Sequence, residues 1–133
     1  MRVNYTIKEA AEKANLRPHT LRYYEEEKLL PHVKRDENGY RSYSEEDLLW
    51  IETIACLRET NISIADLKEM VELTKENKSA LYQRIHILET HQKKLRQQQE
   101  ELKQMEKKVT NKINHLKQLE NTNLTDLEHL RLC

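Results

Sequence analysis

The sequence predicts a mainly α-helical fold, with a small N-terminal domain followed by one long helix. The chain of 133 residues has one Gly and two Pro, too few for a turn-rich β fold. A heptad pattern of apolar residues begins at Leu81 and continues to Leu116. Every aromatic residue except Tyr82 lies before position 51, so composition divides the chain in two. We expect a domain over residues 1–75, a long helix over 79–120 and a short tail helix within 121–133.

Composition excludes several classes of protein. With 35% charged residues, the chain has no apolar run near the roughly 20 residues that span a membrane. Residues 1–12 are too polar for a signal peptide, and Cys56 and Cys133 are too few for a disulfide framework. We therefore expect a cytoplasmic protein without membrane contact. No catalytic pattern, phosphate loop or closed set of metal ligands is evident, so we expect neither an enzyme nor a cofactor or metal.

The first elements predict a helix-turn-helix. Thr6 and Glu9 form the T-x-x-E capping box that opens a helix over about 7–14. Pro18 suits the first position of a second helix, over about 18–27. Two helices joined by a turn of about four residues are the helix-turn-helix arrangement.

A hairpin and two more helices follow. The segment Asp36-Glu37-Asn38-Gly39 is a turn signal between β-prone residues, which predicts a wing hairpin over about 32–43. Ser44, with Asp47 at the third position, is expected to cap a helix over about 45–60. In the same way Ser63 and Asp66 open a helix over about 64–73.

The second part of the chain predicts a dimer-forming coiled coil. Between residues 80 and 120 no Pro or Gly interrupts a helix of about 60 Å. A helix of that length cannot bury its apolar stripe against its own small domain, so a second copy is the natural partner; the alternative is a solvated single helix. Gln92, Gln99 and Glu106 weaken the seam but help to fix its register. The seam residues expected to form the dimer are Leu81, Ile85, Leu88, Leu95, Leu102, Val109, Ile113 and Leu116.

Side chains at the start of the second helix suit DNA recognition, because this part of a helix-turn-helix enters the major groove. His19, Thr20 and Arg22 can donate hydrogen bonds to bases or phosphates, and Tyr23 can bind a phosphate. The alternative is an amphipathic surface helix, which the acidic run 25–27 favours. These acidic side chains could, however, point away from DNA. The hairpin adds Lys34, Arg35, Tyr40 and Arg41, which suit contact with the DNA backbone; alone it would more simply be a solvated loop.

At this point the sequence resembles the MerR family of bacterial transcription regulators. The resemblance covers residues 5–73 and is carried by TIKEAAEKANL, TLRYYEEEKLLP, NGYRSYSEEDLLWI and CLRETNISIADLKEM. It implies a winged helix-turn-helix homodimer, joined by an antiparallel coiled coil, that binds a promoter palindrome in double-stranded DNA. Such dimers distort the DNA so that RNA polymerase can engage both promoter elements. Matched by position, the implied DNA contacts are Thr20, Arg22, Tyr23, Tyr24, Tyr40, Arg41 and Arg58.

Three positions depart from the family pattern. Lys28 and Asn61 stand where Gly is common, and Asn tolerates the left-handed conformation better than Lys does. At Lys28 we therefore expect either a small strain or a different helix end. Arg17 replaces a usual capping Ser, which removes a cap but adds a cation near the DNA. None of these changes alters the fold that the resemblance implies.

The resemblance also suggests a signal. A cysteine stands at the place of Cys56 in a branch of the family that responds to aldehydes and to oxidative or nitrosative stress, through chemistry of the thiolate. The alternative is that Cys56 is a small core residue. Another is a regulator that responds to metals, but His129 and Cys133 are too few ligands for a closed site. Outside this family, the pattern would fit a coiled-coil protein that binds other proteins.

The distribution of charge sharpens the expectation about DNA. Residues 1–72 carry 11 basic and 15 acidic side chains, whereas residues 73–133 carry 12 and 8. The expected DNA-binding domain is therefore acidic overall, and its bulk attraction to DNA is expected to be weak. Binding would then depend on a few placed cations: Arg17, Arg22, Lys34, Arg35, Arg41 and Arg58.

Overall fold

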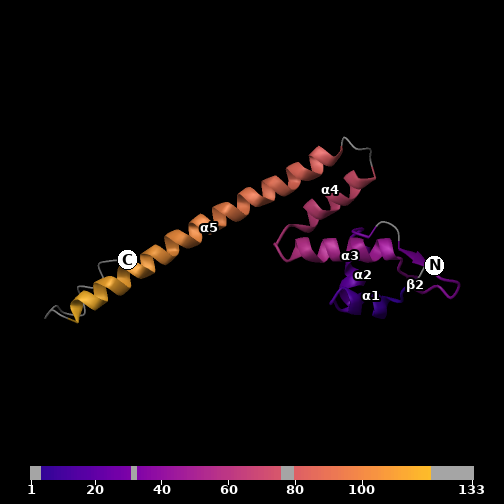
Figure 1. The fold of residues 1–133 in the computed structure, drawn as a ribbon, viewed down its shortest axis with the longest axis horizontal. Coiled ribbons are helices and arrows are strands. Elements are labelled where there is room, and N and C mark those ends of the chain that lie inside the picture. Colours follow the sequence, from indigo (N-terminus) through magenta and orange to yellow (C-terminus); the bar gives the residue numbers. More distant parts are fainter. Residues whose placement is uncertain (1–3, 31–32, 76–79, 121–133) are drawn as a thin grey trace. The chain divides into compact units, whose positions relative to one another are not determined.

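The computed structural model describes residues 4–30, 33–75 and 80–120 and confirms the mainly helical fold (Figure 1). Contacts divide the chain into two compact units, residues 1–88 and 89–133. Each of the four short helices ends within two residues of its expected range. The elements in chain order are α1 (Ile7–Lys13), α2 (Pro18–Glu26), β1 (Lys34–Arg35), β2 (Arg41–Ser42), α3 (Glu45–Arg58), α4 (Ile64–Thr74) and α5 (Ala80–Leu119).

Local capping determines where the first two helices begin. The side chain of Thr6 accepts a hydrogen bond from the Glu9 amide at 3.2 Å, and the Glu9 carboxylate accepts one from the Thr6 amide at 2.9 Å. This reciprocal capping box confirms the predicted start of α1. Pro18 occupies the first position of α2, after Arg17, whose side chain makes no capping hydrogen bond. The expected loss of a cap at Arg17 is therefore confirmed.

The recognition helix α2 ends in a left-handed residue that is not glycine. Lys28 has a φ of 62°, and its amide donates to the Glu25 carbonyl at 2.9 Å. The Leu29 amide donates to the Tyr24 carbonyl, also at 2.9 Å. These two bonds form a Schellman motif, in which the residue that turns the chain is usually Gly. Lys28 adopts this backbone at a steric cost, one of the two outcomes expected from the sequence.

The wing is a short antiparallel hairpin. Lys34 pairs with Ser42 and Arg35 with Arg41. At its tip, one oxygen of the Asp36 carboxylate accepts hydrogen bonds from the amides of Asn38 (2.9 Å) and Tyr40 (3.0 Å). Gly39 completes the turn with a φ of +83°, a conformation that residues with a Cβ rarely adopt.

The helices α3 and α4 begin at the predicted caps. Ser44 and Asp47 form a second reciprocal capping box, with bonds of 2.9 and 3.1 Å, and this box satisfies the buried carboxylate of Asp47. Ser63 accepts a hydrogen bond from the Asp66 amide at 3.0 Å. Between these helices, Asn61 turns the chain with a φ of 64°.

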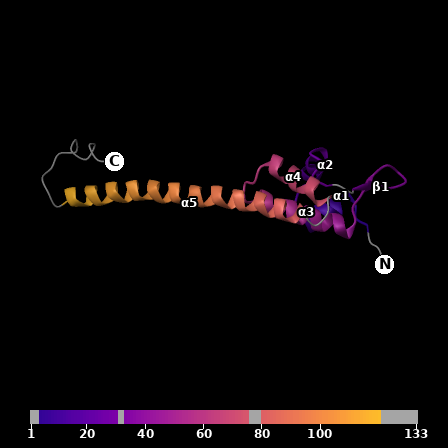
Figure 2. The same cartoon turned by 90° about the horizontal axis from the view of Figure 1, so that it is seen from above.

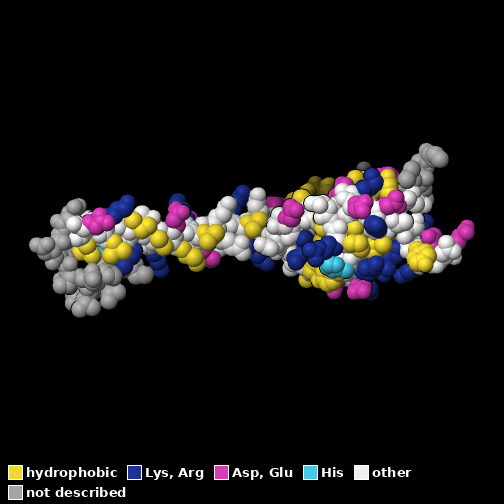
Figure 3. Space-filling view, turned by 90° about the horizontal axis from the view of Figure 1, so that it is seen from below, with side chains coloured by type: hydrophobic (Ala, Val, Ile, Leu, Met, Phe, Trp, Pro, Cys, Tyr) yellow, Lys and Arg dark blue, Asp and Glu magenta, His cyan; other side chains and the backbone are white. Residues whose placement is uncertain are grey.

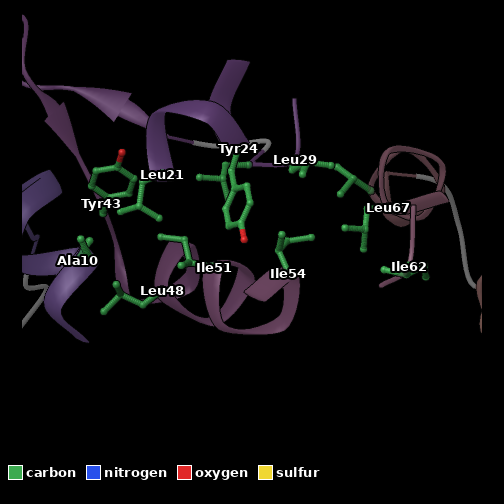
Figure 4. Close-up of a cluster of buried hydrophobic side chains, with 13 residues drawn as sticks. Ala10, Leu21, Tyr24, Leu29, Tyr43, Leu48, Ile51, Ile54, Ile62 and Leu67 are labelled. Carbon is green, nitrogen blue, oxygen red and sulfur yellow. The ribbon is translucent and has the colours of Figure 1, made fainter. Parts of the chain in front are cut away.

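The core of the first unit lies between α1, α2, α3 and α4 (Figure 4). Leu21 and Tyr24 point from α2 into this core, because residues three apart share a helical face. Lys68 of α4 forms an ion pair of 2.7 Å with Glu27 at the end of α2. The fully buried members with the largest side chains are Tyr43, Leu21, Leu29, Ile51, Ile62, Leu67 and Val71.

The long helix α5 is continuous from Ala80 to Leu119 (Figures 1 and 2). Its first turns belong to the N-terminal unit, which reaches Leu88 rather than the boundary at residue 75 that the sequence suggested. The physical reason is packing: Ala80 is buried, and Ile87 packs against the core. The predicted tail helix lies outside the described residues. No helix in the described part of the chain is long and apolar enough to cross a membrane.

The apolar stripe of α5 is exposed within one chain, and Figure 3 shows hydrophobic side chains along the helix. The exposed fraction rises to 64% at Leu102 and 59% at Val109. Leu95 is half-buried. The other seam residues are between 37% and 47% exposed: Leu81, Ile85, Leu88, Ile113 and Leu116. A stripe of this extent is what a partner helix would cover.

Candidate nucleic-acid interface

The first turns of α2 present polar side chains to solvent. His19, Arg22 and Tyr23 are exposed, whereas Thr20 is half-buried. Arg22 has no hydrogen bond or ion pair with any other described residue, so its five donors remain available. Arg17 is also exposed, directly before the helix. On the face shown in Figure 3, Lys and Arg side chains gather over the N-terminal unit.

The fold brings the second helix and the wing together around one cleft. Arg22 from α2 and Arg35 and Arg41 from the wing line a cleft of about 270 Å³. Tyr40, 72% exposed, lines the same cleft. Guanidinium groups bind phosphate oxygens through paired, charge-assisted hydrogen bonds. This arrangement is therefore suited to hold a phosphate of the DNA backbone.

Two of the three arginines are already held by the protein. Arg35 donates from Nη1 to the Gly39 carbonyl at 2.9 Å, which folds its side chain over the turn of the wing. Arg41 donates from Nε to the Glu25 carboxylate on α2. These partners restrict both side chains, and the remaining guanidinium donors are left for a ligand.

Lys34 is not part of this cleft. It precedes Arg35 on β1, and successive residues of a strand point to opposite faces. It lines a second cleft with Asn38, Ser44 and Asp47. Lys34 is exposed, and it shares this second cleft with Arg35 but not with Arg22 or Arg41.

Tyr24 is corrected from a DNA contact to a core residue. Its side chain is 5% exposed, and its hydroxyl points toward the helix that carries Ile51 and Ile54 (Figure 4). Burial raises its pKa above the ordinary value. The adjacent Tyr23 is 44% exposed, since neighbouring residues of a helix are turned by about 100°. Tyr23 is therefore the tyrosine of this pair that can reach DNA.

Arg58 lies at the end of α3, where it supports the turn into α4. Its Nη1 donates to the Ile62 carbonyl, and the side chain is half-buried. The guanidinium is therefore fixed by the fold, and a contact with DNA would use its other nitrogens.

Two residues that the sequence did not single out belong to this site. Glu25 faces the wing, although the acidic run could have pointed away; its position three after Arg22, on the same face of the helix, was the available signal. Tyr43 is fully buried beside the pair, and its hydroxyl has no hydrogen-bond partner among the described residues. Burial, followed by the charge of Glu25, raises the pKa of Tyr43 to about 12.

Comparison with known proteins identifies this arrangement. The sequence profile described as the MerR HTH family regulatory protein matches residues 5–74. The chain belongs to the MerR family. It is a MerR-type DNA-binding transcriptional regulator, and the family match contains α1 to α4 and the wing.

Among curated MerR-like relatives, an uncharacterised HTH-type transcriptional regulator of Haemophilus influenzae is 37% identical over 91 residues, covering 68% of this chain and 67% of the relative. The regulator AdhR of Bacillus subtilis is 43% identical over 82 residues, which cover 62% of this chain and 59% of AdhR. The family assignment therefore rests on residues 5–74, which contain α1 to α4 and the wing.

Solved MerR structures extend the similarity along the chain. HiNmlR, a MerR family regulator lacking the sensor domain and bound to promoter DNA, is 33% identical with a TM-score of 0.67. The match covers 90% of this chain and 94% of HiNmlR. A putative MerR regulator of Listeria monocytogenes is 32% identical with a TM-score of 0.70, covering 88% of this chain and 92% of that one. The long helix is thus shared with MerR structures.

Cys56 lies on α3, outside the cleft. Its side chain is exposed, so the alternative of a buried core cysteine is wrong. It follows Leu49 by two helical turns on the same face, and Leu49 is itself 65% exposed. Among the described residues, no three His, Cys, Asp or Glu side chains form a group that could hold a metal. Cys133 and His129 lie outside the described residues.

Proposed function

We propose that this MerR-type regulator binds a palindromic promoter as a homodimer, with α2 in the major groove and the wing along the DNA backbone. The observation that carries the proposal is the cleft at which Arg22, Arg35 and Arg41 meet. Arginine on a recognition helix can reach a base edge or a phosphate, whereas wing arginines suit the backbone. One cleft therefore combines a sequence-reading element with a backbone-positioning element.

The exposed stripe of α5 supports the homodimer. Leu102, Val109 and Ile113 would be left in water in a single chain, at a cost that an equivalent helix of a second copy removes. An antiparallel arrangement would place the two N-terminal units at opposite ends of the coil. Each unit would then read one half of a palindrome, and the length of α5 would determine the spacing of the half-sites.

The regulatory step is proposed to be distortion of the promoter. A dimer of fixed geometry that holds both half-sites can bend or untwist the DNA between them, because deformation is driven by the contacts it permits. RNA polymerase would then recognise promoter elements that the relaxed DNA presents at an unsuitable spacing. Promoter DNA bound to HiNmlR supports DNA as the target.

Cys56 is the proposed trigger for an electrophilic or oxidative signal. Its exposed thiol is accessible to a reagent without unfolding of α3. Alkylation or oxidation would add bulk or polarity beside Leu49 on the outer face of this helix. Such a change could alter how α3 meets a neighbouring surface and so change the geometry of the bound dimer.

A footprint on the DNA upstream of the chain's own gene tests the proposal. Protection should appear as two symmetric half-sites, and hyper-reactive bases between them would report distortion. Transcription from the same fragment should change when the protein is added. Absence of protection at concentrations that saturate a gel shift, or a single asymmetric half-site, would contradict the homodimer on a palindrome.

A further inference from the structure

An ion pair connects the recognition helix to the wing. Arg41 donates from Nε to Oε2 of Glu25, and the two side chains are 23% and 24% exposed. The partners are 16 residues apart and come from different elements. Because Nε is occupied, the guanidinium offers its Nη donors to a ligand on the side of the cleft. The pair therefore determines both the place and the orientation of Arg41.

A fully buried tyrosine lies near the pair. Tyr43 is fully buried, and its hydroxyl has no partner among the described residues. It is near enough to Glu25 and Arg41 for both charges to affect its pKa. A closely packed, buried aromatic ring restricts the conformations that the two side chains of the pair can adopt. Partial burial also reduces screening of the pair by salt. Arg41 is thus held more firmly than an arginine on an open hairpin would be.

We propose that Glu25 is a specificity-determining residue for DNA binding. This inference rests on the proposed function and assigns a role to an acidic residue within the DNA-binding cleft. Glu25 holds Arg41 where a phosphate of the correctly docked promoter meets it, and it lowers the attraction of the cleft for any other duplex.

Specific and nonspecific binding place different demands on Arg41. When α2 is seated in its own site, a phosphate reaches the Nη donors of Arg41 while Nε stays on Glu25. On an arbitrary sequence α2 is not seated, and the wing must follow the backbone in other positions. Arg41 then pairs with a phosphate only by leaving Glu25, and the freed carboxylate repels the DNA. Glu25 therefore penalises nonspecific binding more than specific binding.

Glu25→Gln tests this role while preserving the shape of the side chain and one acceptor oxygen. Binding is measured by fluorescence anisotropy on the promoter fragment and on a shuffled duplex of equal length, over a series of salt concentrations. Affinity for the shuffled duplex should rise about fivefold, and affinity for the promoter less than about twofold. On the shuffled duplex, the slope of log K against log salt should steepen by about 0.9, one added phosphate contact.

Glu26→Gln is the matched control. Glu26 follows Glu25 on α2, is exposed and has no ion pair with another described residue. The Glu26→Gln variant loses the same charge but leaves Arg41 paired. Its affinity for the shuffled duplex and its salt slope should therefore change clearly less. In an Arg41→Gln background, Glu25→Gln should no longer steepen the salt slope. Circular dichroism of each variant checks the fold. If Glu25→Gln alone is destabilised, the double variant is compared with Arg41→Gln alone.

The outcomes separate this inference from the proposed function. If the wild type prefers the promoter but Glu25→Gln behaves as Glu26→Gln does, Glu25 has no special role and the inference is overturned. The inference is also overturned if Glu25→Gln still steepens the salt slope in the Arg41→Gln background. If the wild type does not distinguish promoter from shuffled duplex, the proposed function fails, and the inference fails with it.

Discussion

Tyr5 and Tyr43 exchange two backbone hydrogen bonds, of 2.7 and 2.8 Å, which attach the N-terminal segment to the end of the wing. The Tyr5 hydroxyl also donates to the Glu45 carboxylate at 2.5 Å, beside the start of α3. The wing is therefore fixed at its base, although its strands are only two residues long. The same link holds the buried Tyr43 near the pair formed by Glu25 and Arg41.

Tyr43→Phe should change the response of stability to alkaline pH. The folded pKa of Tyr43 is about 12, above the ordinary tyrosine value of 10.0, so the unfolded chain releases this proton first. Stability from Tyr43 is complete below pH 10 and is lost as the pH rises toward 12. The Phe variant should lose less stability over that interval. At pH 7 it should match or exceed the stability of the wild type by about 1 kcal/mol, since it removes a buried hydroxyl that has no partner in the described part of the chain.

Urea unfolding at pH 7 and at several values above pH 10 provides the measurement. Tyr40→Phe is the control, because Tyr40 is 72% exposed and should leave the pH dependence unchanged. Equal loss of stability for the wild type and Tyr43→Phe between pH 10 and 12 would show that this hydroxyl is not protected by burial.

Lys28→Gly should stabilise the protein. Lys28 has a φ of 62° at the end of α2, where a residue with a Cβ meets a steric cost that Gly avoids. The gain should be about 1 kcal/mol, seen as a rise of roughly 4–8 °C in Tm. Lys28→Ala removes the same charged chain but keeps the Cβ. Thermal melts in which Ala stabilises as much as Gly would assign the effect to the lysine side chain instead of the backbone.

Polar residues in the α5 stripe should dissociate the homodimer. Leu102→Gln with Val109→Gln removes apolar area that a partner helix would bury, so the dimer should weaken by at least about tenfold. Lys103→Gln with Thr110→Gln places the same residue type one position further along the helix and should leave the dimer intact. Light scattering after size exclusion, over a range of concentrations, measures both. A double seam variant that remains dimeric at the lowest concentration would refute this interface.

Cys56→Ala should abolish the response to aldehydes or oxidants while promoter binding survives. The exposed thiol should be modified in the folded protein, as intact-mass spectrometry can measure. Cys133→Ala serves as the control and should respond as the wild type does. Transcription in vitro with and without the reagent gives the functional readout. A Cys56→Ala protein that still responds to the reagent would show that the sensing residue is not Cys56.

Features determined by neighbouring residues could be predicted from the sequence. Capping boxes, Pro18 and the turn at Gly39 act over a few residues, so their positions were expected correctly. Tyr24 was misplaced although the signal was present: Leu21 and Tyr24 are three apart, so a core position for one implies it for the other. The pairing of Glu25 with Arg41 joins two elements, and residue patterns do not determine such contacts. The exposure of Cys56 likewise depends on what packs against α3.

Binding of Arg22→Ala to the upstream promoter fragment tests the central account most directly. Arg22 is exposed on the recognition helix and lines the cleft with Arg35 and Arg41, without a protein partner among the described residues. Its loss should remove most of the preference for the promoter over a shuffled duplex, because a good bidentate contact contributes about 1–3 kcal/mol of discrimination. Anisotropy titrations of both proteins on both duplexes at one salt concentration measure that preference. A preference in Arg22→Ala equal to that of the wild type would contradict the placement of this helix in the major groove.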